Sequence, residues 1–67
     1  MSKIAILGAA ESGVGAAVLA LKKGYDVFVS DMGKIKDRYK QMLDIHGIEW
    51  EEGQHTADRI LDAEEII

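Results

Sequence analysis

The fold is decided by residues 3–15, which read KIAILGAAESGVG. Residues 3–7 are nearly all apolar, as in a strand that is covered on both faces of a parallel sheet. Glycines then interrupt the pattern, and apolar residues return with helical spacing from Val14 onward. The stretch therefore predicts a strand that enters a helix through a glycine-rich turn.

Such a turn is suited to binding an anion. Backbone N–H groups at a helix start lack intrahelical partners, and the helix dipole places about half a positive charge beside them. The pattern predicts a helix over residues 12–23, with Ser12 as its N-cap and Gly24 in a left-handed conformation after its end. We expect residues 8–13 to bind phosphate. The alternative is that these glycines only let the helix pack close to the sheet, a role also expected for Gly15.

The rest of the chain repeats the alternation of strand and helix. Residues 25–30 are predicted to form a second buried strand, which ends at Asp31. The next helix presents one apolar face and closes at Gly47. The apolar face of that helix consists of Ile35, Tyr39, Met42 and Leu43. After it we expect a short exposed strand over residues 48–51, a helical turn over residues 56–62 capped by Thr56, and a fourth strand that begins in residues 64–67.

This alternation predicts an α/β fold, a parallel sheet in the order 3-2-1-4 with helices on both faces. A ligand is expected where the strand order reverses, over the glycine loop and near the end of the fourth strand. Residues 1–67 are expected to form one domain. Because the chain stops at Ile67 inside an apolar run, we expect it to be a fragment of a longer protein, truncated in the fourth strand.

Composition excludes several function classes. The chain has 67 residues, a net charge of −4 and no cysteine, so disulfides, thiolate metal sites and thiol nucleophiles are absent. The acidic balance gives no support for a nucleic-acid partner, and no apolar run is long enough to span a membrane. No metal-ligating or catalytic constellation is recognised. We expect a cytoplasmic protein without nucleic-acid or membrane partners.

The loop also discriminates among phosphate binders. A dinucleotide fingerprint requires glycine at positions 8, 10 and 13, but position 10 is Ala10, which disfavours NAD or FAD without excluding them. A phosphate-binding loop of the Walker type requires lysine followed by serine or threonine where Val14 and Gly15 stand. Phosphoryl transfer is therefore not expected at this loop.

A few polar side chains are candidates for the site. Asp31 ends the second strand, where an acidic side chain can accept hydrogen bonds from a ribose or a base, or can instead cap the next helix. Glu11 is expected to offer its backbone N–H while its side chain points to water. His55 follows the third strand and either contributes to binding or lies in a solvated loop, whereas His46 is expected to be structural.

Three segments resemble a known family. ILGAAESGVG at residues 6–15, VFVSD at residues 27–31 and EGQH at residues 52–55 resemble the N-terminal domain of UDP-N-acetylmuramoylalanine:D-glutamate ligases, the MurD family, in the form found in Bacteroidetes-like bacteria. The resemblance spans nearly the whole chain. It implies a Rossmann-like domain that holds the uridine diphosphate part of UDP-N-acetylmuramoyl-L-alanine, with ATP, Mg²⁺ and D-glutamate bound by later domains.

The resemblance also implies roles for single residues. Backbone amides at Glu11 and Ser12 would contact the uridine phosphates, and Asp31 would meet the uracil ring. Met32 and Gly33 stand where the family can carry polar uracil-binding residues, so Lys34 or main-chain groups would substitute. A Ser-Pro-Gly-type turn that completes the pocket would lie beyond the last residue. The candidate substrate-binding residues are Gly8, Ala10, Glu11, Ser12, Gly13, Asp31, Met32 and Gly33.

The resemblance therefore implies that the chain is one domain of a cell-wall ligase and that this fragment alone is inactive. In the parent enzyme, the resemblance implies that ATP phosphorylates the alanyl carboxylate and that the amine of D-glutamate then displaces the phosphate. Two alternatives of other classes stay open. The chain could be the NAD- or FAD-binding domain of an oxidoreductase, or a regulatory or scaffold module that binds no nucleotide.

Overall fold

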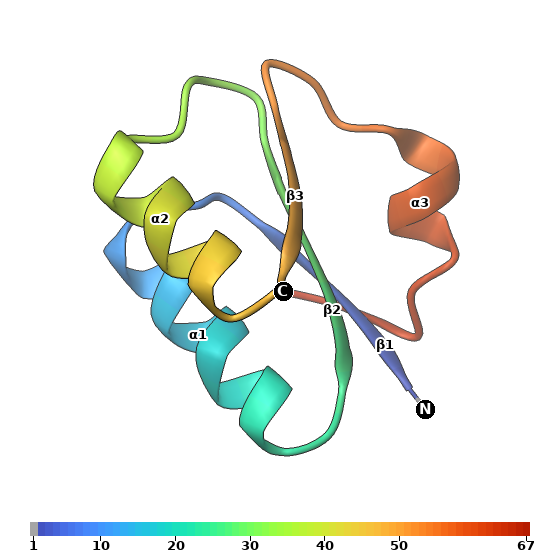
Figure 1. The fold of residues 1–67 in the computed structure, drawn as a ribbon. Coiled ribbons are helices and arrows are strands. Elements are labelled where there is room, and N and C mark those ends of the chain that lie inside the picture. The colour runs from blue at the N-terminus through green and yellow to red at the C-terminus, as the bar shows by residue number, and fades with distance from the viewer. Residues whose placement is uncertain (1) are drawn as a thin grey trace.

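The computed structural model describes residues 2–67 and contains a four-stranded parallel sheet in the order β3-β2-β1-β4. The strands are β1 (Lys3–Leu7), β2 (Asp26–Asp31), β3 (Glu49–Glu52) and β4 (Glu65–Ile66). The helices are α1 (Glu11–Lys22), α2 (Asp37–Ile45) and α3 (Ala57–Leu61). Helices α1 and α2 cover one face of the sheet and α3 covers the other (Figure 1). The predicted fold class and strand order are confirmed.

Strand β1 lies between β2 and β4 in the sheet, and this interior position explains why its sequence is almost entirely apolar. Ile4 and Ile6 point toward α1 and α2, whereas Ala5 points toward α3, where it packs with Phe28 and Ile60. Both faces of the strand are therefore buried, as the run of apolar residues predicts. The larger core lies on the α1 and α2 side and consists of Ile4, Ile6, Ala9, Val14, Ala17, Ala20, Val27, Val29, Ile35, Leu43 and Ile48.

Glycine ends α1 in the predicted way. Gly24 has φ of +91°, a left-handed conformation that favours glycine. Its N–H donates to the Leu21 carbonyl at 3.0 Å, and the next N–H, from Tyr25, donates to the Ala20 carbonyl at 3.1 Å. This pair of bonds is the Schellman motif, which satisfies carbonyls that the helix end leaves open.

Other details of the helices differ from expectation. The N-cap of α1 is Ala10, not Ser12, which lies in the first helical turn. The packing role expected for Gly15 is wrong, because a Cβ built there meets nothing within 4 Å. Ile35 is buried but precedes α2, and Met42 is 43% exposed rather than part of the core.

Candidate phosphate-binding site

Two glycines shape the loop between β1 and α1. Gly8 has φ of +102°, and its N–H donates to the Ser30 carbonyl at 2.7 Å, which ties the loop to the end of β2. At Gly13 an added Cβ would lie 1.9 Å from the Gly8 carbonyl oxygen, so the helix start packs directly on the loop backbone. The path of the chain therefore requires glycine at both positions.

The first turn of α1 presents unpaired donors. The helical hydrogen bonds begin with Val14 N–H, which donates to the Ala10 carbonyl at 2.9 Å. Ala10 has no side chain that could cap the helix, and the N–H groups of Glu11 and Ser12 have no acceptor among residues 2–67. The Glu11 side chain is exposed, as expected. An anion could therefore bind these N–H groups and complement the helix dipole.

Asp31 connects this loop to the next one. One carboxylate oxygen, Oδ2, accepts the Ala9 N–H at 2.8 Å, and the other, Oδ1, accepts the Gly33 N–H at 2.8 Å. These hydrogen bonds, that from Ala9 first, hold the pKa of Asp31 below its ordinary value of 3.8. The alternative that Asp31 caps the next helix is wrong, because Lys36 occupies the N-cap of α2.

A cleft of about 350 Å³ lies over the loop at the carboxyl ends of β1 and β2, where Ile67 follows β4. This is the position at which parallel α/β sheets bind ligands. Its lining residues are Ile6, Leu7, Gly8, Ala9, Ala10, Ser12, Gly13, Ala16, Asp31 and Ile67. Five of the predicted site residues are therefore brought together in one cleft, namely Gly8, Ala10, Ser12, Gly13 and Asp31.

The other three predicted residues do not line this cleft. Glu11 lines a separate groove between α1 and α2, although its backbone starts the helix. Met32 is 62% exposed. Gly33 is held by the Asp31 carboxylate and by the Gly53 N–H, which donates to the Gly33 carbonyl at 2.9 Å. Met32 and Gly33 therefore lie in the adjoining loop between β2 and α2.

Sequence reasoning missed a polar cluster under the ends of β2 and β3. The fully buried hydroxyl of Ser30 donates to Glu51 Oε2 at 2.7 Å, and His55 Nδ1 lies within hydrogen-bond distance of the same hydroxyl oxygen. Since a hydroxyl has one proton, holding both bonds requires that His55 Nδ1 carry a proton. The sequence shows a serine within an apolar strand and a histidine after the third strand, but nothing in it indicates that the two side chains meet.

Glu51 is the acceptor at the centre of this cluster. Burial alone would raise the pKa of Glu51, but hydrogen bonds from the Thr56 N–H, the Thr56 hydroxyl and the Ser30 hydroxyl hold it below the ordinary 4.5. Thr56 occupies the expected N-cap of α3, but its hydroxyl donates a hydrogen bond to Glu51 and does not cap the helix. His55 contacts the Ser30 hydroxyl and does not line the cleft, whereas His46 Nδ1 contacts the Met42 carbonyl at 2.8 Å, a contact within its own segment of the chain.

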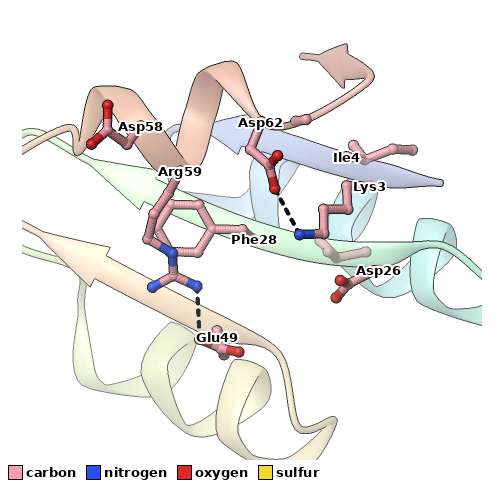
Figure 2. Close-up of a pocket in the computed structure, with 10 residues that line it drawn as sticks. Lys3, Ile4, Asp26, Phe28, Glu49, Asp58, Arg59 and Asp62 are labelled. Atoms are coloured by element: carbon pink, nitrogen blue, oxygen red, sulfur yellow. Dashed lines mark hydrogen bonds and ion pairs between the residues drawn. The ribbon is translucent and has the colours of Figure 1, made fainter. Parts of the chain in front are cut away.

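A second cleft, of about 310 Å³, lies between the sheet and α3 at the amino ends of the strands. Figure 2 shows the Arg59 guanidinium over the Phe28 ring, 3.8 Å from its centroid, and its ion pair with Glu49 at 2.7 Å. Lys3 pairs with Asp62 in the same cleft. Its cations are thus already paired with carboxylates, and the cleft lies at the opposite end of the strands from the glycine loop.

Within residues 2–67, neither a candidate metal cluster nor a helix that could cross a membrane is present. No three side chains of histidine, aspartate or glutamate gather there in a way that could hold a metal ion. None of the helices in this part of the chain has both the length and the apolar character that crossing a bilayer requires.

Comparison with known proteins identifies the family. The model of the MurD N-terminal domain matches residues 3–67. A UDP-N-acetylmuramoylalanine–D-glutamate ligase of Bacteroides fragilis is 63% identical over 67 residues, which is 100% of this chain and 15% of the relative. The ligase of the same name from Porphyromonas gingivalis is 59% identical over 64 residues, covering 96% of this chain and 14% of the relative.

A more distant relative of the same name, from Chlorobium phaeobacteroides, is 44% identical over 62 residues, covering 92% of this chain and 13% of the relative. No solved structure gave a significant match. The chain spans about 15% of the length of the relatives that it matches most fully. The family model covers nearly the whole chain, and the predicted resemblance is confirmed: this chain belongs to the MurD N-terminal domain family.

Proposed function

We propose that the chain binds the uridine diphosphate part of UDP-N-acetylmuramoyl-L-alanine, as the N-terminal domain of a ligase that adds D-glutamate in peptidoglycan precursor synthesis. The observation that carries this proposal is the uncapped start of α1. Its N–H groups at Glu11 and Ser12 have no acceptor within residues 2–67, and Ser12 lines the cleft that also contains Asp31. Unpaired donors at a helix start favour a diphosphate.

The proposed roles follow from the positions of these residues. The diphosphate accepts hydrogen bonds from the amides of Glu11 and Ser12, while Gly8, Ala10 and Gly13 keep the backbone close to it. Each Asp31 oxygen already accepts one N–H. A carboxylate oxygen has two lone pairs, so Asp31 can also accept the N–H of uracil. Met32, Gly33 and Lys34 lie beside the base.

The remaining steps are proposed for the ligase as a whole. ATP with Mg²⁺ and D-glutamate bind outside the segment that this chain represents, and ATP supplies the phosphoryl group that activates the alanyl carboxylate. The amine of D-glutamate then forms the amide bond as phosphate leaves. The contribution of this chain is to hold the nucleotide end of the substrate, so it has no activity alone. Because the reaction consumes ATP, we place the enzyme in the cytoplasm.

The test is a nuclear magnetic resonance titration of the labelled chain with UMP, with UDP-N-acetylmuramic acid and with NAD. We expect the amide signals of residues 8–15 to shift with the uridine compounds. A dissociation constant near a millimolar, or about 4 kcal/mol, would count as support. Shifts with NAD alone would refute the proposal and favour an oxidoreductase domain, and no shift with any nucleotide would favour a scaffold module.

A variant separates base recognition from phosphate recognition. Asp31→Asn keeps one acceptor oxygen but replaces the other with an NH₂ group, which cannot accept the uracil N–H. We expect UMP affinity to fall about tenfold, because a hydrogen bond to a charged group is lost, with a smaller change for inorganic pyrophosphate. Asp26→Asn, at the other end of β2, is the matched control and should leave both affinities unchanged.

A further inference from the structure

Hydrogen bonds to residues at the end of β3 hold the loop between β2 and α2 in place. Gly53 N–H donates to the Gly33 carbonyl at 2.9 Å, as described above. Glu52 Oε1 accepts the Ile35 N–H at 3.0 Å and also pairs with Lys40 Nζ at 3.0 Å. A single carboxylate oxygen therefore joins the C-terminal part of this loop to the first turn of α2.

These contacts are only partly exposed to water. The side chains of Lys40 and Glu52 are 26% and 25% exposed, compared with 51% and 61% for the surface pair Lys3–Asp62. Partial burial reduces screening by solvent, so a charge-assisted hydrogen bond at Glu52 is stronger than a surface ion pair. Hydrogen bonding to the Ile35 N–H, and then to Lys40, holds the pKa of Glu52 below the ordinary 4.5, which keeps it ionised at neutral pH.

The same loop is joined to the phosphate-binding loop through Asp31. The Gly33 N–H donates to one oxygen of Asp31, and the other oxygen accepts the Ala9 N–H. A continuous series of bonds thus runs from Glu52 and Gly53 through the β2–α2 loop to the cleft. The Met32 side chain, which is 62% exposed, cannot fix this loop by burial.

The loop offers few polar side chains to a base. At positions 32 and 33 it carries methionine and glycine, and the Gly33 N–H and carbonyl are both occupied. Recognition of a base edge beside Asp31 must then use the Lys34 side chain or the remaining main-chain groups of residues 32–34. Main-chain groups discriminate between bases only if the loop is held in one conformation. A mobile loop would also lose conformational entropy on binding, which weakens the affinity.

We propose that Glu52 is a positioning residue for recognition of the base: its bond to the Ile35 N–H holds the β2–α2 loop so that Asp31 and the main chain of residues 32–34 meet the uracil. This role rests on the proposed function of the site. Glu52 itself is not among the residues that line the cleft, and the role proposed for it is therefore indirect.

The test compares UMP with inorganic pyrophosphate, followed by nuclear magnetic resonance in the chain and in three variants. Glu52→Ala removes the acceptor, and we expect UMP affinity to fall about fivefold to tenfold, the scale of a typical net hydrogen-bond contribution, with pyrophosphate affinity within about twofold. Glu52→Gln keeps an acceptor oxygen for the Ile35 N–H and should retain most of the UMP affinity. Glu49→Ala breaks a carboxylate–cation pair at the other end of β3 and should change neither affinity.

A second readout keeps the role distinct from a general loss of folding. In free Glu52→Ala the amides of Gly33 and Ile35 should shift and exchange faster with solvent, whereas those of Glu11 and Ser12 should keep their positions. Equal losses for UMP and pyrophosphate, or no loss in Glu52→Ala, would overturn the positioning role while leaving the proposed function intact. If the unsubstituted chain binds pyrophosphate but not UMP, the proposed function and this role both fail.

Discussion

At Gly13 the fold leaves no room for a side chain. A Cβ there would lie 1.9 Å from the Gly8 carbonyl oxygen and 2.9 Å from the Gly8 carbonyl carbon, both backbone atoms that cannot move aside cheaply. We expect Gly13→Ala to lower the free energy of unfolding by about 1–3 kcal/mol, as measured by urea denaturation.

Gly15 provides the matched control two residues further along the same helix. It is exposed, and a Cβ there meets nothing within 4 Å. Gly15→Ala should therefore raise the free energy of unfolding by about 0.5–1 kcal/mol, since alanine is the better helix former. If Gly13→Ala were as stable as Gly15→Ala, the close contact between the helix start and the loop would be wrong.

At the scale of elements, sequence periodicity predicts the positions of helices and strands well, because the burial of one or both faces of an element produces that periodicity. Residues 3–7 were predicted as a strand and form β1 with the same bounds, and the order of all seven elements is as expected. The start of α1 was placed at Ser12 because serine is a preferred N-cap. The actual start is set by the loop, which turns at Gly8 and brings the Ala10 carbonyl to the Val14 N–H. Residue preference alone contains no information about that loop.

The missing cap of α1 leads to a prediction in which stability and binding change in opposite directions. In Ala10→Ser the new hydroxyl can accept the N–H of Ser12 or Gly13, which should raise the free energy of unfolding by about 1 kcal/mol. A diphosphate then competes with the hydroxyl, so pyrophosphate affinity should fall about fivefold, the equivalent of that energy. Lys36→Ser makes the same change at the uncapped start of α2 and should stabilise the protein without weakening pyrophosphate binding. Unchanged pyrophosphate binding in Ala10→Ser would argue against the helix start as the anion site.

For the whole molecule, the parts of the site that escaped prediction are those made by contacts between distant residues. The sequence placed Asp31 at the end of a strand, but nothing in its neighbourhood shows that its carboxylate accepts the Ala9 N–H. The contacts of Ser30 with His55 and of Glu52 with the Ile35 N–H likewise join separate elements. Periodicity reports which face of an element is buried, whereas these polar pairings depend on how the strands are aligned in the finished sheet.

Several of these pairings involve carboxylates, so the stability of the molecule should depend on pH. Hydrogen bonds from backbone and side-chain donors in the folded state hold the pKa values of Asp31, Glu51 and Glu52 below the ordinary 3.8 for aspartate and 4.5 for glutamate. A carboxyl whose pKa is lower in the folded state than in the unfolded state stabilises the protein fully above the unfolded value, and this stabilisation is lost as the pH falls through the folded value. We therefore expect the free energy of unfolding to decrease as the pH falls below about 5, because the unfolded state then binds more protons than the folded state.

Urea denaturation at a series of pH values tests this dependence and assigns part of it to one side chain. Glu51→Gln removes the titrating group that holds Ser30 and Thr56, so this variant should be less stable than the unsubstituted chain at pH 7 but should lose less stability on acidification. Glu64→Gln changes an exposed glutamate and serves as the control, with the acid dependence expected to stay as in the unsubstituted chain. Should Glu51→Gln lose stability with acid as steeply as Glu64→Gln, the acid sensitivity would have to come from carboxylates other than the one that joins the ends of β2 and β3 to the start of α3.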